Sequence, residues 1–372
     1  MFRTVMLSLL LVPTVLVCAE SDPPPSSGSA LDRQLHALAE SERFSGGVLA
    51  AHGERVLFRN AYGNASKEFS VPNSPDTRFV LGSINKMFTA TAVLQLVEQG
   101  RLDLDATVAR HLPGVLAGDV AGRMTLLQLL THTSGLGDFL FTPELEHRNR
   151  ADYRTIEDYL PLVADDSPAF EPGTDWQYSN TGYLLLGAIL EQETRQDYYG
   201  YVREHVLEPA GMQDSGSPAL DLVPRGVAST YEPRAGEGRF HSDRYDQVVK
   251  GTPAGGGVST LDDMHRFALA LMGGHLLSPE MSRRMLTPKP EAGSERYGFG
   301  AQIFPDGWVG HTGGGPGTAN YFGFRPATGE VVVVLANQIG DSLEVAALAQ
   351  QLLQQHAPAE QQAGTTVGTE PR

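Results

Sequence analysis

The sequence is almost free of cysteine: Cys18 is the only one among 372 residues. It lies in a stretch, residues 1–19, that has the pattern of a signal peptide. Arg3 supplies a positive charge, residues 5–17 are nearly all apolar, and Ala19 ends a cleavage site of small residues. Cleavage there leaves a mature chain without cysteine, which excludes disulfides and thiolate chemistry. We therefore expect an exported protein, periplasmic or secreted.

Two alternatives for this N-terminal segment are less favoured. An uncleaved membrane anchor would need a longer apolar run, and Pro13 interrupts the one present. Lipidation at Cys18 would place Val17 where a lipoprotein signal normally has a small residue. After cleavage, we expect no stable membrane span.

Basic residues are also scarce, with 28 Lys and Arg against 44 Asp and Glu and a formal net charge of −16. Neutralising a phosphate backbone requires clustered basic side chains, and no such stripe is present. Nucleic acid is therefore not an expected partner. The acidic balance favours solubility and does not bear on the fold.

Several catalytic signatures are missing as well. The 11 histidines form no H-E-x-x-H motif and no tight cluster with aspartate, so no metal and no other cofactor is expected. No serine lies in a G-x-S-x-G motif, which argues against an α/β-hydrolase.

The periodicity of apolar residues predicts where helices and strands lie. Residues 20–30 are rich in Pro, Ser and Gly and are expected to form a linker, and residues 357–372 a disordered tail. A hairpin is expected around Gly53, and residue Thr125 is expected to cap a helix. The predicted helices are 31–39, 83–99, 126–132, 183–193, 198–207 and 343–354, and the predicted strands are 46–51, 55–61, 297–304, 308–311, 319–324 and 331–336.

Strands at both ends of the chain with helices between them predict an α+β fold. We expect an antiparallel sheet formed from both chain ends, flanked by helices and carrying a mostly helical inserted lobe. The α/β lobe would comprise residues 31–80 and 285–356, and the helical lobe residues 81–284. The two lobes should meet in a cleft, with Ser83 at the start of the first inserted helix and His311 at the end of a late strand.

Three separate stretches carry polar residues suited to catalysis. In the first, Lys86 follows Ser83 by one helical turn, so its amine can reach the serine hydroxyl, and a helix N-terminus favours a developing oxyanion. The second contains Tyr178 and Asn180, and the third begins at His311 with the sequence H-T-G-G-G. Each stretch alone is unremarkable, because Ser–Lys pairs, polar loops and glycine-rich turns are common.

Together the stretches have the order and spacing of penicillin-recognising serine enzymes, S-x-x-K, Y-x-N and H-T-G. The chain resembles the β-lactamase-related family that includes class C β-lactamases, D-alanyl-D-alanine carboxypeptidases and related esterases. The resemblance covers residues 31–355 and extends to the stretches 100–105, 129–136, 178–187, 208–212 and 254–260.

This resemblance implies a mechanism. Ser83 would attack a carbonyl and form an acyl-enzyme that water hydrolyses, with the N–H groups of Ser83 and Gly314 as the oxyanion hole. Lys86 and Tyr178 would share the proton transfers. Asn180 would position Lys86 and the substrate amide, and His311, Thr312 and Gly313 would bind substrate.

The sequence does not decide whether Lys86 or Tyr178 is the general base. Both side chains ordinarily titrate about three units above neutral pH. Burial of Lys86 would favour its neutral amine, whereas a Lys86 cation beside Tyr178 would favour the phenolate.

The third stretch departs from class C β-lactamases, which carry Lys where His311 stands. Histidine is mostly neutral at pH 7, with an ordinary pKa of ~6.5. We therefore expect peptidase or esterase action on a small-molecule or peptide substrate, and better hydrolysis of carboxylate-bearing substrates as the pH falls toward 6. His132, in a stretch that ends a helix, is expected to be structural.

Three alternatives stay open: a true β-lactamase, a non-catalytic homologue that binds peptidoglycan fragments or peptides, and an unrelated amidohydrolase with another Ser–Lys pair. The last leaves the Tyr and His stretches unexplained. The oligomeric state is not specified by the sequence.

Overall fold

The computed structural model describes residues 27–234, 239–243, 246–290, 294 and 296–356. The predicted signal peptide and the predicted C-terminal tail lie outside these residues. Helix α1 begins at Ser27, so residues 27–30 are helical and not part of a linker.

The helices and strands of the described residues have the following bounds. The helices are α1 (Ser27–Glu40), α2 (Asn85–Glu98), α3 (Val108–His111), α4 (Leu126–Thr131), α5 (Pro143–His147), α6 (Ile156–Tyr159), α7 (Asn180–Thr194), α8 (Tyr198–Val202), α9 (Leu261–Met272), α10 (Pro279–Met285) and α11 (Ser342–Gln355). The strands are β1 (Gly46–His52), β2 (Arg55–Tyr62), β3 (Asn64–Ser66), β4 (Val71–Pro72), β5 (Phe79–Val80), β6 (Tyr231–Arg234), β7 (Arg239–Ser242), β8 (Val258–Ser259), β9 (Gln302–Ile303), β10 (Val309–Gly315), β11 (Thr318–Arg325) and β12 (Glu330–Ala336).

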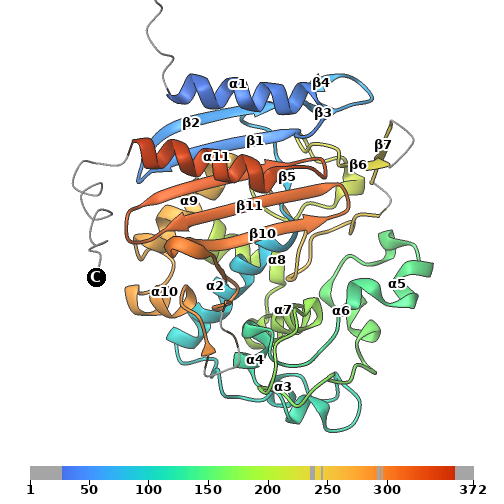
Figure 1. The fold of residues 1–372 in the computed structure, drawn as a ribbon. Coiled ribbons are helices and arrows are strands. Elements are labelled where there is room, and N and C mark those ends of the chain that lie inside the picture. The colour runs from blue at the N-terminus through green and yellow to red at the C-terminus, as the bar shows by residue number, and fades with distance from the viewer. Residues whose placement is uncertain (1–26, 235–238, 244–245, 291–293, 295, 357–372) are drawn as a thin grey trace, which may run out of the picture.

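The main sheet combines strands from the two ends of the described chain (Figure 1). Its strand order is β2-β1-β12-β11-β10-β9, and every neighbouring pair is antiparallel. The pairing of β1 with β12 joins the N-terminal hairpin to the C-terminal strands, from Gly46 opposite Ala336 to His52 opposite Glu330. The predicted α+β fold with a sheet built from both ends is confirmed.

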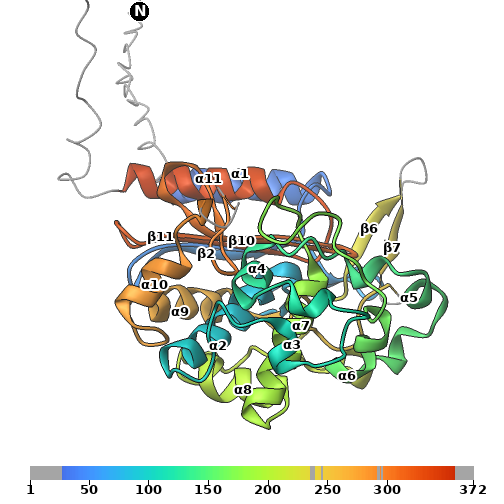
Figure 2. The same cartoon turned by 90° about the horizontal axis from the view of Figure 1, so that it is seen from below.

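Helices cover both faces of this sheet. Figure 2 shows α1 and α11 as an outer layer on one face and the remaining helices on the other. The valine-rich strand β12 faces both layers, because side chains alternate along a strand. Val332 and Val334 pack with α1 and α11. Val331 and Val333 belong to the cluster that includes the inner helices, which is why the strand is apolar at nearly every position.

Local signals in the sequence identify several element ends correctly. The Thr125 side chain caps α4 in a capping box with Gln128. Gly53, in the β1–β2 turn, has a φ of +57°. Both features agree with the predictions made from turn and cap chemistry.

The predicted strand at residues 297–304 is much shorter in the structure. Only Gln302–Ile303 form β9, because the chain turns at Gly298 and Gly300. Gly300 has a φ of +69°, and the Gly298 N–H donates to the Ala301 carbonyl at 2.8 Å. The turn brings Tyr297 back toward the sheet.

The proposed division into lobes stays a prediction. One hydrophobic cluster extends from the inner face of the sheet through α2, α4, α7 and α9, so the helical part shares its core with the sheet. Helix α9, within residues 81–284, packs against β1 and β12. None of the helices in the described ranges is long and apolar enough to cross a bilayer.

Candidate active site

Ser83 lies in a tight turn between β5 and α2. Residues Gly82–Ile84 form one 3-10 turn, and α2 begins directly afterwards at Asn85, so the helix start predicted at Ser83 is two residues too early. Gly82 has a φ of +58°, and a Cβ atom there would lie 2.6 Å from the Gly314 carbonyl oxygen. Only glycine lets this turn approach strand β10 so closely. The sequence thus places Ser83 at the N-terminal end of α2, beside the third stretch.

Lys86 is buried beneath the serine. Its side chain is fully buried, and Nζ lies 3.3 Å from Ser83 Oγ and 2.6 Å from Asn180 Oδ1. Nζ also donates to the Ala254 carbonyl oxygen. Burial lowers the pKa of Lys86 to about 7, and the negative charge of Asp138 opposes this shift. Near neutral pH, a large share of the molecules therefore carries the neutral amine.

Tyr178 lies in the loop that leads into α7. Burial raises the pKa of its phenol above the usual value, and a hydrogen bond with Ser83 opposes the rise. Lys86 Nζ lies 4.7 Å from the centroid of the Tyr178 ring. The phenol thus contacts the same hydroxyl as the lysine, but its environment favours the protonated form.

Strand β10 supplies backbone to the site. It pairs with β11 along its whole length but with β9 only at Val309 and Gly310, so the edge beyond Gly310 is not covered by β9. A Cβ atom on Gly313 would overlap the Leu81 carbonyl oxygen, whereas one on Gly314 would meet nothing within 4 Å. Gly313 therefore packs against the serine turn, and Gly314 borders open space beside it.

The geometry brings together Ser83, Lys86, Tyr178, Asn180 and β10 from distant parts of the chain. The profile of the family described as Beta-lactamase matches residues 31–357, which include all of them. The chain belongs to the β-lactamase family.

Individual relatives agree with this membership. The chain is 31% identical to "Penicillin-binding protein 4*" of Bacillus subtilis over 305 residues, covering 77% of this chain and 66% of that protein. It is 37% identical to "Esterase EstB" of Burkholderia gladioli over 204 residues, covering 51% of this chain and 52% of that protein. The solved structure of a D-stereospecific amidohydrolase from Streptomyces sp. aligns with a TM-score of 0.72 at 27% identity, covering 86% of this chain and 97% of that one.

These likenesses confirm the expected class: the chain is a β-lactamase-related serine hydrolase. They also confirm the resemblance drawn from the three stretches.

One residue of this β-lactamase-family site was not expected from the sequence. Asp138 accepts a hydrogen bond from Asn180 Nδ2 at 2.5 Å, and the same amide accepts from Lys86 through its oxygen. Burial raises the pKa of the Asp138 carboxyl, while hydrogen bonds and the Lys86 charge oppose the rise. Asp138 follows the stretch 129–136 by two residues, and the only signal in the sequence was a single carboxylate among apolar neighbours.

His311 differs from what the sequence predicted. Its side chain is only 1% exposed, its Nε2 lies 2.9 Å from the Tyr297 hydroxyl, and its Nδ1 lies 2.5 Å from the Thr312 carbonyl. Burial, together with the Lys86 charge, lowers the pKa of His311 to about 3. The imidazole is therefore neutral at pH 6, and the expected gain for carboxylate-bearing substrates through its protonation is wrong. The ring contacts Tyr297 through Nε2, and a role of His311 in substrate binding stays a prediction.

His132 is structural, as expected. It ends α4 with a φ of +62°, its side chain is fully buried, and its Nδ1 accepts the Ser179 N–H at 3.1 Å. Burial lowers its pKa well below the usual value. Its ring packs against Tyr178, with centroids 4.3 Å apart, so it supports the loop that carries the phenol.

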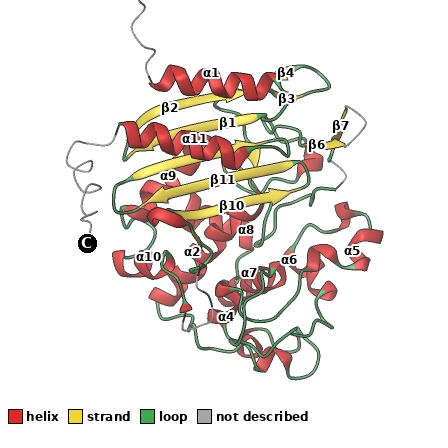
Figure 3. Cartoon of the chain, viewed as in Figure 1, coloured by secondary structure: helices red, strands yellow, loops and turns green. Residues whose placement is uncertain are grey.

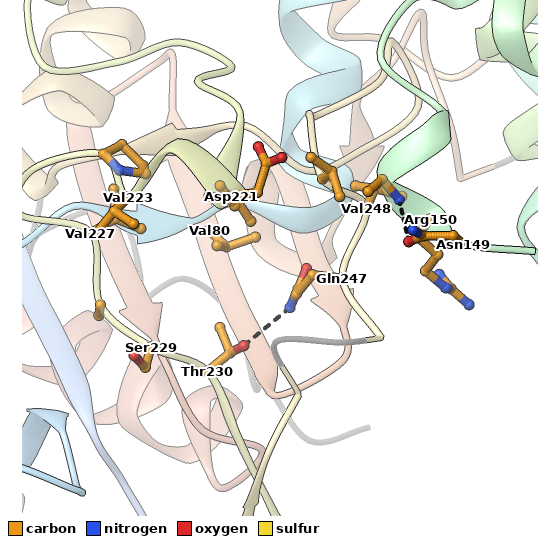
Figure 4. Close-up of a pocket in the computed structure, with 15 residues that line it drawn as sticks. Val80, Asn149, Arg150, Asp221, Val223, Val227, Ser229, Thr230, Gln247 and Val248 are labelled. Atoms are coloured by element: carbon orange, nitrogen blue, oxygen red, sulfur yellow. Dashed lines mark hydrogen bonds between the residues drawn. The ribbon is translucent and has the colours of Figure 1, made fainter.

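Two cavities differ in their relation to the site. One, of about 650 Å³, reaches Thr312 and the exposed ring of Trp176. The other, of about 490 Å³, is mostly apolar and is lined by Val80 but by none of Ser83, Lys86 and Tyr178 (Figure 4). In Figure 4, Val227 lies beside Val80, and Gln247 donates to Thr230 at 3.3 Å.

Proposed function

We propose that this chain hydrolyses ester or amide bonds through an acyl-enzyme on Ser83, with small esters and D-alanyl peptides favoured over β-lactams. The observation that carries the proposal is the buried amine of Lys86, 3.3 Å from Ser83 Oγ, with a pKa near 7. A serine hydroxyl needs an adjacent base to become a nucleophile, and this amine is in reach.

Lys86 is the proposed base for acylation. As a neutral amine it has two protons, which its contacts with Asn180 and Ala254 would use, leaving the lone pair for the Ser83 hydroxyl. The amine would take the hydroxyl proton while Ser83 Oγ bonds to the substrate carbonyl carbon. Tyr178 is the weaker candidate, because burial raises the pKa of its phenol.

The developing oxyanion would be bound by the backbone N–H groups of Ser83 and Gly314. Removing one such donor typically costs ~10²–10³ in rate. The Tyr178 phenol, hydrogen-bonded with Ser83, would protonate the leaving atom as its bond to the carbonyl carbon breaks. The proton held by Lys86 would then return to Tyr178, and water would hydrolyse the acyl-enzyme.

Two features support the substrate preference. His311 is buried and neutral, so the third stretch lacks the cation that class C β-lactamases present. The likeness to an esterase and a D-stereospecific amidohydrolase favours esters and D-amino acid amides.

Labelling with a fluorescent phosphonate tests the nucleophile. We expect the wild type and Ser41→Ala, a serine at the end of α1, to be labelled and Ser83→Ala to remain unlabelled. Equal labelling of all three would contradict the proposal. Hydrolysis of p-nitrophenyl esters, D-alanyl peptides and nitrocefin then ranks the substrates.

Export is part of the same proposal and rests on the pattern of residues 1–19. N-terminal sequencing of the mature protein should begin at Glu20.

A further inference from the structure

A tight turn at residues 252–255 contacts the lysine of the site. Thr252 and Gly255 exchange two backbone hydrogen bonds, of 2.7 and 3.2 Å, which close the turn. The Ala254 carbonyl oxygen within it accepts from Lys86 Nζ. Thr252 and Ala254 are almost completely buried, and a buried carbonyl group needs a partner from the protein. The direction of the Ala254 carbonyl therefore depends on what holds the rest of this turn.

The start of helix α2 holds the other carbonyl groups of the 252–255 turn. Asn85 Nδ2 donates to the Thr252 carbonyl oxygen at 2.7 Å. Thr89 Oγ1 donates to the Pro253 carbonyl oxygen, also at 2.7 Å. Positions 85, 86 and 89 of a helix are neighbours on its surface. Together with the lysine, three side chains of α2 thus bind three consecutive carbonyl oxygens.

Tyr198 of α8 determines the direction of these hydrogen bonds. Its hydroxyl oxygen lies 2.6 Å from Thr89 Oγ1 and 3.4 Å from Asn85 Nδ2. The Thr89 hydroxyl has one proton and the Pro253 carbonyl can only accept, so Tyr198 must donate to Thr89. The Tyr198 oxygen then accepts the second proton of the Asn85 amide. Since all three side chains are buried, water does not compete for these protons.

The turn matters for catalysis because Lys86 can act as a base only if its lone pair faces the Ser83 hydroxyl. A neutral amine has two protons, and the contacts with Asn180 and Ala254 use both. If the Ala254 carbonyl turned away, one of these protons would be free to point at Ser83 Oγ, 3.3 Å from Nζ. The amine would then donate to the serine and could not accept its proton.

We propose that Asn85 and Thr89 are positioning residues of the hydrolase, which hold the 252–255 turn and thereby aim the lone pair of Lys86 at the Ser83 hydroxyl. The inference rests on the proposed function, in which Lys86 is the base for acylation. Both residues act through the turn and not on the substrate. Tyr198 orients the two side chains toward it.

Two buried threonines of α2 form a matched pair for the test. Thr89→Val removes the hydroxyl that binds the turn and keeps a side chain of similar shape. Thr91→Val is the control, because Thr91 is equally buried but its hydroxyl donates to the Met87 carbonyl oxygen within the helix at 2.7 Å. The measured quantity is kcat/KM for a neutral p-nitrophenyl ester across the pH range, which reports on the free enzyme.

In Thr89→Val, the value of kcat/KM above the acidic limb should fall by roughly 10-fold, the effect of one lost hydrogen bond. The acidic limb itself should move to lower pH, because a displaced carbonyl no longer stabilises the ammonium form of Lys86. Thr89→Ser keeps the hydroxyl and should restore both, and Thr91→Val should retain both. The other titratable groups around the lysine are the same in every variant: Asp138, Tyr178, His132 and His311.

Melting temperatures check that the variants fold, and Asn85→Ala repeats the test at the Thr252 carbonyl if Thr89→Val does not fold. Wild-type kcat/KM and an unmoved limb in whichever of the two folds would overturn the inference. Equal changes in Thr89→Val and Thr91→Val would overturn it as well. Both results leave the hydrolase proposal in place if the wild type hydrolyses the ester and takes the phosphonate. A wild type that does neither would overturn that proposal too.

Discussion

Asp138 should set the pH at which the site becomes active. Asn180 connects Lys86 to Asp138 through two hydrogen bonds. Lys86 Nζ lies 2.6 Å from Asn180 Oδ1, and Asn180 Nδ2 lies 2.5 Å from Asp138 Oδ2. With the amide between them, the two charges are at most about 7 Å apart, where an effective dielectric constant of about 20 gives roughly 2 kcal/mol. This corresponds to about 1.5 pKa units.

Asp138→Asn removes that charge and keeps an oxygen that can accept from Asn180. The ammonium form of Lys86 loses its stabilising partner, so the pKa of Lys86 should fall from about 7 by roughly one to two units. Since the neutral amine is the active form, the acidic limb of the pH profile should move to lower pH by the same amount.

The assay is kcat/KM for a neutral ester across the pH range, which reports the pKa of groups in the free enzyme. Burial keeps the neighbouring His311, with a pKa of about 3, and His132, with a pKa well below its usual value, from titrating in this range. A wild-type profile without a limb near neutral pH would refute the assignment of Lys86. A limb that stays in place or moves upward in Asp138→Asn would refute the electrostatic reasoning.

Two further substitutions probe the same site. Gly82→Ala should reduce kcat/KM by at least 10-fold and lower stability by about 1–3 kcal/mol, because its φ of +58° disfavours a side chain and the new Cβ meets the Gly314 carbonyl. Steady-state kinetics and denaturant unfolding measure both, and wild-type values would contradict the expected close contact. For Lys86→Met, the relevant quantity is the difference in unfolding free energy from the wild type. The folded pKa of about 7 lies below the unfolded value of ~10.4, so between them the unfolded chain binds more protons and wild-type stability rises with pH. The unfolding free energy of the wild type minus that of Lys86→Met should therefore increase by up to about 1.4 kcal/mol per pH unit from pH 7 to pH 9. Urea unfolding at several pH values measures this difference, and a difference that does not change with pH would contradict the prediction.

The sequence predicted the elements that depend on local pattern. The continuous burial of β12, the Thr125 cap and the Gly53 turn follow from the run of apolar residues, from cap chemistry and from turn chemistry. The three catalytic stretches were found because their order along the chain is distinctive. These stretches meet around Ser83 because strands from the two ends of the chain pair in one sheet. The predicted strands at both ends had already suggested that pairing.

What the sequence could not predict depends on which side chains meet after folding. The contact of His311 with Tyr297 requires the turn at Gly300, and the same turn shortens the predicted strand to β9. The hydrogen bond of Asp138 to Asn180 joins a loop to the first residue of α7, 42 residues apart. A periodic pattern contains no information on such pairs, because each partner alone is an ordinary polar residue.

The central position of β12 has a consequence for how the protein opens. Its side chains contact the outer layer of α1 and α11 through one face and the inner helices through the other, and every residue of the strand is buried. Its amide protons should therefore exchange with solvent water only when both layers separate. Deuterium uptake in β12 would then report global unfolding, whereas exchange in the exposed loops would report local opening.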